Sequence, residues 1–362
     1  MLRRLRLTSV RCHTALDLET LGPRVLLAGA NGLGKTTILE SVSVLARLRS
    51  FRTRALRDLT SHGAEGWRIE GAWADEAGPV RLGVIFRGAG RELELEGRAG
   101  ATTDEFWGRA LTVVAHGGDS VVLEGGSAER RAGFDLLLSE IEPNRLPEFR
   151  RLREIIRQRS ALLRQPRASR EEWEAWTTTL SELAVSLRPA RQALARAFSP
   201  HLEKAHRELT AGAEKLRVTY QPDDPIPETG LERDRLWERE RDRGLNCTGP
   251  QRDDWDFTLA GRSLARFGSE GQRRSATLAV RLAELELIRE ARRRTPVLLV
   301  DDALKELDET RREAFWKIVP SECQVLYASA HDRPPQGSDS WVILTISPGM
   351  AGIETGRVLP RP

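Results

Sequence analysis

The sequence has few cysteines and no long apolar run, and both shortages exclude classes of protein. Its three cysteines, Cys12, Cys247 and Cys323, are far apart in 362 residues. This spacing excludes a disulfide framework or a cysteine-rich metal site and favours a reducing compartment. No stretch approaches the ~20 apolar residues that a membrane span needs, and no apolar run follows the basic start MLRRLRL. We therefore expect a cytoplasmic protein with no signal peptide and no membrane partner.

Lysine is also scarce, since only five of the 57 basic residues are lysines. One of them, Lys35, stands in Gly29-Ala-Asn-Gly-Leu-Gly-Lys-Thr36, which matches the phosphate-loop pattern G-x-x-x-x-G-K-[ST] without a mismatch. The apolar run 25–28 predicts a strand before the loop, and apolar residues at helical spacing from Ile38 predict a helix after it. The alternative, a plain strand-to-helix turn, does not need the complete pattern.

The loop predicts a nucleotide site because backbone N–H groups of such a turn, together with a helix start, bind phosphate. Lys35 is predicted to reach the β- and γ-phosphates, and the Thr36 hydroxyl to ligate Mg²⁺. The residues assigned to the nucleotide are Gly29, Ala30, Asn31, Gly32, Leu33, Gly34, Lys35, Thr36 and Thr37.

Two carboxylates close an apolar run near the C-terminus, in Thr-Pro-Val-Leu-Leu-Val-Asp301-Asp302. The run is typical of a buried parallel strand with acids at its carboxyl end. A solvated turn is the alternative, but a phosphate loop in the same chain favours Mg²⁺ binding by Asp301.

A second helix start with phosphate-binding features follows Phe267, in Ser269-Glu-Gly271-Gln272. It is either an ordinary N-cap with a glycine or an anion-binding helix N-terminus. One bound nucleotide needs one phosphate loop in its own chain. A second phosphate-binding start is therefore expected if it completes the site of another subunit.

Ser269-x-Gly271-Gln272 resembles the signature motif of ABC-type ATPases in the form found in SMC-like heads, and the family it resembles most is the bacterial RecF family of recombination and gap-repair proteins. The further stretches that carry the resemblance are Ser50-Phe-Arg-Thr53, Ser127-Ala-Glu-Arg130-Arg131 with Asp135, Gly249-Pro-Gln-Arg-Asp-Asp254, and Asp301-Asp302-Ala-Leu-Lys-Glu-Leu-Asp308. The stretches stand in the family's order, and the resemblance as a whole runs from about residue 2 to beyond 330.

The resemblance implies an α/β fold: an ABC-type ATPase head with a mixed β-sheet core around the phosphate-loop helix and an inserted, mainly helical lobe without a long coiled coil. It implies ATP and Mg²⁺ as cofactors and an ATP-dependent homodimer. Two heads would clamp DNA, at gapped duplex or single-strand/double-strand junctions, and weak DNA-dependent ATP hydrolysis would reset the clamp. The implied roles are recombinational DNA repair, replication restart and the SOS response, with RecO and RecR as functional partners.

The resemblance also implies residue roles. Asp301 would hold Mg²⁺, Asp302 would position the attacking water, and Asp308 would belong to the D-loop. His331 falls at the position of a switch histidine, and a plain loop histidine is the alternative. The chain departs from the family at Gly117-Gly-Asp119-Ser, where a Q-loop is expected, so whether Asp119 or His331 senses the γ-phosphate stays open.

Three regions are expected along the chain: head residues 1–110, an inserted lobe over 111–245, and the remainder of the head over 246–362. Strands are predicted within 2–28 and over 66–73, 79–87 and 91–96. Residues 140–215 predict two or three helices of moderate length, interrupted at Pro166 and Pro189. The stretch 221–245 predicts an exposed loop.

Two arginine clusters are denser than an ordinary solvated surface and are hypothetical DNA contacts. They are Arg52, Arg54 and Arg57, and Arg150, Arg151, Arg153, Arg157 and Arg159. The alternatives for the whole protein are the ATPase subunit of a membrane transporter, and a metabolite kinase or GTPase. The helical insertion argues against the first. The signature-like motif and the lack of an N-K-x-D base reader argue against the second.

Overall fold

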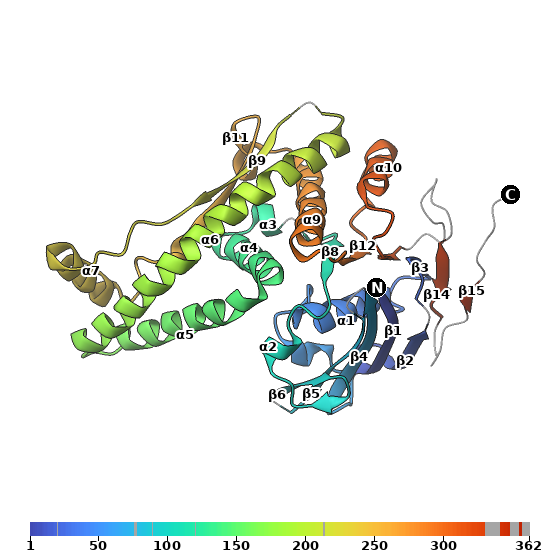
Figure 1. The fold of residues 1–362 in the computed structure, drawn as a ribbon, viewed down its shortest axis with the longest axis horizontal. Coiled ribbons are helices and arrows are strands. Elements are labelled where there is room, and N and C mark those ends of the chain that lie inside the picture. The colour runs from blue at the N-terminus through green and yellow to red at the C-terminus, as the bar shows by residue number, and fades with distance from the viewer. Residues whose placement is uncertain are drawn as a thin grey trace. The chain divides into compact units, whose positions relative to one another are not determined.

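The computed structural model describes residues 1–19, 21–75, 78–88, 90–119, 121–212, 214–329, 341–347 and 355–356, and divides the chain into two compact units (Figure 1). The first unit consists of Met1–Asp119, Glu208–Ala211 and Leu278–Pro362. The second consists of Ser120–Arg207 and Gly212–Thr277. The domain limits expected at 110 and 245 stay a prediction, while the compact units change at 119/120 and 277/278.

The first unit contains an antiparallel sheet with the strand order β2-β1-β4-β5-β6-β7. Its strands are β1 (Leu2–Val10), β2 (His13–Glu19), β4 (Gly66–Asp75), β5 (Gly78–Arg87), β6 (Gly90–Leu95) and β7 (Arg98–Ala99). Leu5 and Leu7 of β1 are buried while Arg6 between them is exposed, the alternation of a sheet with one covered face. The strands predicted over 66–73, 79–87 and 91–96 are confirmed.

A second sheet in this unit has the order β15-β14-β3-β13-β12-β8, and its pairs are parallel except that between β14 and β15. Its strands are β3 (Arg24–Ala28), β8 (Thr112–His116), β12 (Val297–Asp301), β13 (Val325–Ala328), β14 (Val342–Thr345) and β15 (Thr355–Gly356). Parallel strands end at one edge, so the residues after β3 and β12 meet there. Strand β3 confirms the strand predicted over 25–28, and β12 confirms the parallel strand predicted in the apolar run before Asp301 and Asp302.

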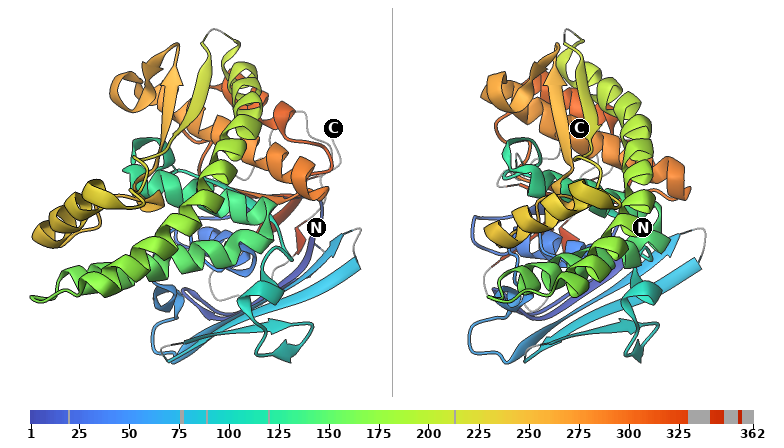
Figure 2. Two further views of the ribbon diagram at one scale, coloured as in Figure 1. Left: turned by 60° about the vertical axis from the view of Figure 1, so that its left-hand side comes forward. Right: turned by 90° about the vertical axis from the view of Figure 1, so that its left-hand side faces the viewer.

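Helix α1 (Lys35–Arg47) contacts strands of both sheets, β12 and β13 on one side and β4 and β5 on the other. This double contact explains why almost every residue of α1 is buried, including the polar Ser41 and Ser43. Short helices η1 (Leu56–Leu59), α2 (Thr103–Phe106) and α10 (Glu309–Ile318) complete the unit. Figures 1 and 2 show α1 over the inner face of the antiparallel sheet. Its N-terminus is thereby fixed at the edge where β3 and β12 end.

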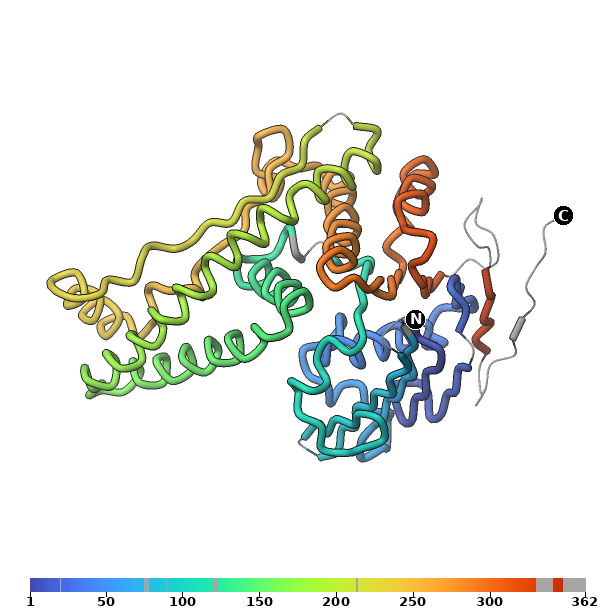
Figure 3. Tube along the Cα trace, viewed as in Figure 1, coloured from blue at the N-terminus to red at the C-terminus, as the bar shows by residue number. Residues whose placement is uncertain are grey.

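The second unit is mainly helical (Figure 3). Its elements are α3 (Val121–Glu124), α4 (Ser127–Ile141), η2 (Pro143–Arg145), α5 (Leu146–Leu163), α6 (Arg170–Thr210), α7 (Gly230–Arg243), η3 (Pro250–Arg252) and α8 (Leu264–Phe267), with an antiparallel sheet of β9 (Leu216–Gln221), β10 (Asp254–Leu259) and β11 (Arg262–Ser263). Helix α9 (Glu270–Arg292) begins in this unit and ends in the first, and the end of α6, from Glu208 on, also belongs to the first.

The prediction that Pro189 interrupts the helical region is wrong, whereas the break at Pro166 between α5 and α6 is confirmed. Pro189 and Pro200 lie inside α6, whose 41 residues make it about 60 Å long, far beyond the moderate length expected. Each proline removes one N–H donor from the helix. The helix nevertheless continues because its apolar face stays packed around Pro189, with Leu187 and Leu194, about two turns apart, both buried.

The exposed loop predicted over 221–245 is also wrong in part. Residues 222–229 lie outside any helix or strand, but 230–243 form α7. Leu236 and Trp237 are buried on one face of α7, and Glu240 lies one turn further along the same face. The sequence predicted a loop here because most residues of α7 are charged. Few apolar residues are enough for this short helix to pack against α5 and α6. Among the described residues, no helix is both long and apolar enough to cross a membrane.

Candidate nucleotide-binding site

The loop between β3 and α1 has positive φ angles at three of its glycines. Gly29, Gly32 and Gly34 have φ of +129°, +85° and +92°, a region that side-chain-bearing residues rarely adopt. A Cβ at Gly29 would also stand 2.6 Å from the carbonyl oxygen of Ile346. Gly34 is the N-cap of α1 and offers no side-chain cap to the helix. The first N–H groups of α1 are therefore left for a ligand, in the manner of an anion-binding helix start.

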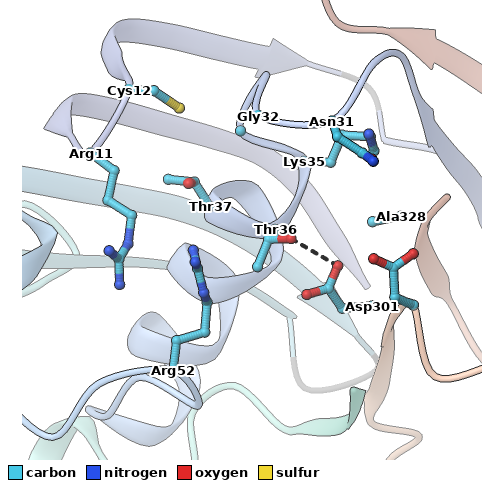
Figure 4. A pocket seen from close by; sticks show the side chains of 12 residues that line it. Arg11, Cys12, Asn31, Gly32, Lys35, Thr36, Thr37, Arg52, Asp301 and Ala328 are labelled. Atoms are coloured by element: carbon cyan, nitrogen blue, oxygen red, sulfur yellow. Dashed lines mark hydrogen bonds between the residues drawn. The ribbon is translucent and has the colours of Figure 1, made fainter. Parts of the chain in front are cut away.

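The side chains of Lys35 and Thr36, the first residues of α1, donate hydrogen bonds to different parts of the site. The Lys35 ammonium donates to the carbonyl oxygens of Gly29 and Ala30, at 2.7 Å and 2.9 Å. The Thr36 hydroxyl donates to Oδ1 of Asp301 at 3.0 Å, although 265 residues separate the two in sequence (Figure 4). The parallel sheet thus brings together the loop and the acidic strand end that the sequence singled out separately.

These residues surround a cavity of about 310 Å³. Its lining residues are Arg11, Cys12, Asn31, Gly32, Gly34, Lys35, Thr36, Thr37, Arg52, Asp301, Asp302 and Ala328. Figure 4 shows the phosphate loop and Asp301 on two sides of this space, with Arg11 and Arg52 on a further side. Three cationic side chains and two carboxylates around one cavity suit an anion that carries a divalent cation.

Asp301 and Asp302 differ in their environment. Asp301, at the end of β12, is only 9% exposed. Burial raises the pKa of Asp301 to about 6, the hydrogen bond from Thr36 opposes this rise, and the nearby charge of Asp302 adds to it. Asp302 is exposed and has a φ of +53°, unusual for a residue other than glycine. The Thr36 hydroxyl and the Asp301 carboxylate supply the oxygen donors that Mg²⁺ takes, so these residues fit the ion.

Sequence reasoning did not assign Arg11 and Glu40 to the site. Glu40, on α1, is completely buried and accepts two hydrogen bonds from Arg11, at 2.6 Å and 2.8 Å. Arg52 approaches the same carboxylate at 3.7 Å, and Ser50 donates to it. One buried carboxylate thereby holds two arginines at the cavity. A glutamate five residues after the loop lysine, next to the apolar Ile38 and Leu39 of the predicted helix, is the signal that points to this arrangement.

Asp119, Asp308 and His331 are three further residues that the sequence singled out for the site. Asp119 is buried and accepts two hydrogen bonds from Arg281, both 2.9 Å, so the guanidinium balances its charge. Asp119 is not among the residues that line the cavity. Asp308 caps α10 by accepting from the backbone N–H of Arg311 at 2.8 Å. His331 lies outside the described residues.

Ser269, Gly271 and Gln272 lie at the start of α9 in the second unit. The Ser269 hydroxyl accepts from the Gln272 N–H at 3.2 Å, and the Gln272 side chain accepts from the Ser269 N–H at 2.8 Å. This reciprocal pair is a capping box. The structure therefore contains the predicted N-cap, and nucleotide binding by these residues stays a prediction.

The two remaining motifs of the second unit bind each other. Arg130 makes a two-pronged contact with Asp254, at 2.8 Å and 2.7 Å. Arg191, only 1% exposed, donates to both Asp135 and Asp253. Because a buried arginine needs such partners, the network ties α4 and α6 to the start of β10. These residues build the unit's interior.

The prediction that Arg159 belongs to a DNA-contacting arginine cluster is wrong. Arg159 is completely buried and donates to Glu240 at 2.7 Å and to Thr177 at 3.1 Å. Arg159 follows the buried Leu152 by seven residues and the buried Ile155 by four, so it lies on the inner face of α5. The other residues of the cluster, Arg150, Arg151, Arg153 and Arg157, are exposed. In the other cluster, Arg52 lines the cavity, and its DNA contact stays a prediction.

Comparison with known proteins gives consistent relatives, although no protein-family model matches the chain. The DNA replication and repair protein RecF of Synechococcus sp. (strain JA-3-3Ab) is 31% identical over 352 residues, covering 91% of each chain. That of Halalkalibacterium halodurans is 32% identical over 345 residues, covering 91% of this chain and 92% of the relative.

Solved structures show the same fold. The recombination mediator protein RecF-ATP in the RecFOR pathway aligns with a TM-score of 0.86 at 22% identity, over 98% of this chain and 97% of that one. An Smc head bound to the C-terminal winged-helix domain of ScpA aligns with a TM-score of 0.57 at 14% identity, over 98% of this chain and 97% of that one. The predicted ABC-type ATPase head fold is confirmed. By its sequence relatives, the chain belongs to the RecF family of DNA replication and repair proteins.

Proposed function

We propose that this chain is an ATP-dependent DNA-binding protein of recombinational DNA repair, replication restart and SOS induction, in which bound ATP closes a homodimer on DNA. The observation that carries the proposal is the joining of the uncapped α1 start, Lys35, and the Thr36–Asp301 pair around one cavity. The RecF relatives and the solved RecF-ATP structure support it. They speak against the alternative of a membrane-transporter ATPase subunit.

ATP would place its phosphates against the N–H groups of the loop and of the first turn of α1. The Lys35 ammonium would exchange its carbonyl acceptors at Gly29 and Ala30 for phosphate oxygens, which are stronger acceptors because they are charged. Thr36 and Asp301 would hold Mg²⁺, which when bound neutralises phosphate charge. With a pKa of about 6, Asp301 is a carboxylate at neutral pH and can serve as that ligand.

Weak, DNA-dependent ATP hydrolysis is the proposed enzymatic activity. Asp302 lines the cavity beside Asp301 and is exposed to solvent, so its carboxylate can orient a water molecule and accept its proton. An aspartate reaches less far than a glutamate, which fits slow turnover. His331 is the proposed switch histidine, which would sense the γ-phosphate.

Dimerisation would bring Ser269, Gly271 and Gln272 of one chain to the ATP of the other, with Asp308 contributing from the D-loop. The capping box satisfies the Gln272 N–H within the free chain. A γ-phosphate at this helix start would take over that satisfied N–H as acceptor, so the exchange costs little. Gapped duplex or single-strand/double-strand junctions are the proposed DNA, and RecO and RecR the proposed functional partners.

The test combines oligomeric state and DNA binding, each measured with and without ATP. Wild type should form a dimer with ATP and bind gapped duplex more tightly in that state. Lys35→Met should weaken ATP binding by about 100-fold in calorimetry, because a charged hydrogen bond contributes about 1.5–3 kcal/mol. Equal ATP affinity in the two proteins would remove the loop from nucleotide binding. DNA affinity indifferent to ATP in wild type would remove the ATP dependence.

A further inference from the structure

Helix α5 exposes an excess of positive charge. Its exposed charged residues are Arg150, Arg151, Arg153 and Arg157, against the one acid Glu154. A further exposed arginine, Arg164, is the C-cap of the helix. Glu154 is bound by Arg157 through two contacts of 2.9 Å and 2.6 Å. Arginines therefore outnumber acids among the exposed charged side chains of α5.

Helix α7 of the same unit gives an internal comparison. It exposes as many arginines, Arg235, Arg239, Arg241 and Arg243, but intersperses them with the acids Glu232, Glu238 and Asp242. Mixed signs are the ordinary solvated helix face. The imbalance on α5 is therefore a property of that helix and does not follow from the chain's general richness in arginine.

The arginines of α5 also form a line. Arg150, Arg153, Arg157 and Arg164 are separated by three, four and seven residues, the spacing of one face of an α-helix. With 1.5 Å of rise per residue, this arginine stripe is about 21 Å long. Duplex DNA has a phosphate about every 3.4 Å along each strand, so the stripe spans about six phosphates of one strand.

Nothing on this face suits a lipid surface. Most large apolar residues of α5, among them Phe149, Leu152 and Ile155, are buried within the unit, and Ile156 is half-buried. A helix that lies on a membrane needs its apolar face free to enter the lipid. Among the described residues, the large hydrophobic side chains that are exposed, Val185, Leu231, Leu245 and Phe267, all lie outside α5.

We propose that the arginine stripe of α5, Arg150, Arg153, Arg157 and Arg164, binds the phosphate backbone of DNA. The inference rests on the proposed function and adds to it the surface that meets DNA. Contacts of this kind are independent of base sequence and contribute affinity through counterion release. An acidic protein partner is the other polyanion that the stripe could bind, and the test separates the two.

The experiment compares wild type, an α5 variant (Arg150→Gln, Arg153→Gln and Arg157→Gln) and an α7 variant (Arg235→Gln, Arg239→Gln and Arg243→Gln). The two variants lose the same charge from helices of one unit. Fluorescence anisotropy with gapped duplex and ATP is recorded over a series of salt concentrations. Circular dichroism and ATP calorimetry, expected to match wild type in both variants, show that folding and the nucleotide site are intact.

The α5 variant should lower the slope of log K against log salt by about 2.7, since each lost duplex phosphate contact removes about 0.9. At 0.15 M salt this corresponds to an affinity about 100-fold weaker, while the α7 variant keeps the wild-type slope. An unchanged slope in the α5 variant, or an equal loss in both variants, overturns the inference and leaves an acidic protein as the stripe's partner. If wild type itself binds no DNA with ATP, the proposed function fails first, and this outcome is recognisable before any variant is compared.

Discussion

The starts of α1 and α9 are both predicted phosphate-binding helix N-termini, but they are built differently. Helix α1 begins after Gly34, which has no side chain to cap it, and its first turn contains no acid. Helix α9 begins after Ser269, which shares a capping box with Gln272, and its first turn contains Glu270. The sequence shows glycine near both starts. The structure leaves one open and closes the other with its own side chains.

The difference indicates a division of work. At α1, Lys35, the Thr36–Asp301 pair and the first turn of the helix line one cavity, as the proposed nucleotide site of a single chain requires. At α9, the capping box takes up the N–H groups of Ser269 and Gln272, and no lysine is among these contacts. This is the asymmetry expected if α9 completes the site of a second chain.

The largest expected effect separates binding from turnover at the α1 cavity. Asp302→Asn keeps the size of the side chain but removes the proton acceptor, so ATP hydrolysis should slow by about 10²–10⁴-fold. ATP affinity should stay at the wild-type level, and the ATP dimer on DNA should last longer. Single-turnover kinetics with calorimetry measures both. Normal turnover would assign the role of base to another group.

The next effect concerns α9. Ser269→Arg places a bulky side chain at a start where a second chain is expected to pack, at a cost of about 1–3 kcal/mol per site and twice that in a symmetric dimer. The variant should bind ATP as a monomer but show no ATP-dependent dimer in light scattering. A normal ATP dimer of Ser269→Arg protein would contradict the two-headed clamp.

Mixing two inactive variants sharpens this comparison. A dimer of one Ser269→Arg chain and one Lys35→Met chain contains one site with both wild-type residues and one site with neither. Partial recovery of dimer or hydrolysis indicates that the two helix starts meet across chains. If the mixture is as inactive as each variant alone, the sites are not shared.

The pKa of Asp301 predicts a pH-dependent penalty in the protein free of Mg²⁺ and nucleotide. The folded pKa of about 6 lies above the ordinary 3.8, so the folded state binds more protons and its stability falls as pH rises from about 4 to 6. Asp301→Asn should therefore raise the free energy of unfolding by up to about 3 kcal/mol at pH 8 and by little at pH 4. Urea unfolding at the two pH values tests it, and an equal gain at both would show that charge is not the cause.

The smallest effect tests the capping box. Gln272→Ala removes one side of the reciprocal pair and should cost about 0.3–1.5 kcal/mol of stability in urea unfolding. Gln165→Ala, at an exposed position after α5, is the matched control and should cost nothing measurable. The α1 start has no side-chain cap to lose. Wild-type stability of the Gln272→Ala protein would mean that the box contributes nothing in solution.

The sequence predicted those parts of the fold that depend on neighbours along the chain. Glycines at 29, 32 and 34 are needed where the backbone turns into positive φ, and apolar alternation over 66–87 follows from one buried sheet face. The same local reasoning failed at Pro189 and α7. There, packing against other helices outweighed the proline and the high charge.

By itself, the sequence determined the phosphate loop, the acidic strand end and the family, because each is written in contiguous residues whose spacing sets local backbone and chemistry. Only the tertiary structure decided which of them meet. Strand order in the parallel sheet brings Asp301 to Thr36, and the burial of Glu40 selects Arg11 and Arg52 as its partners. It also turned Arg159 inward while its neighbours on α5 stayed exposed. A buried charge must find a counter-charge close by in space, and such partners can stand anywhere in the sequence.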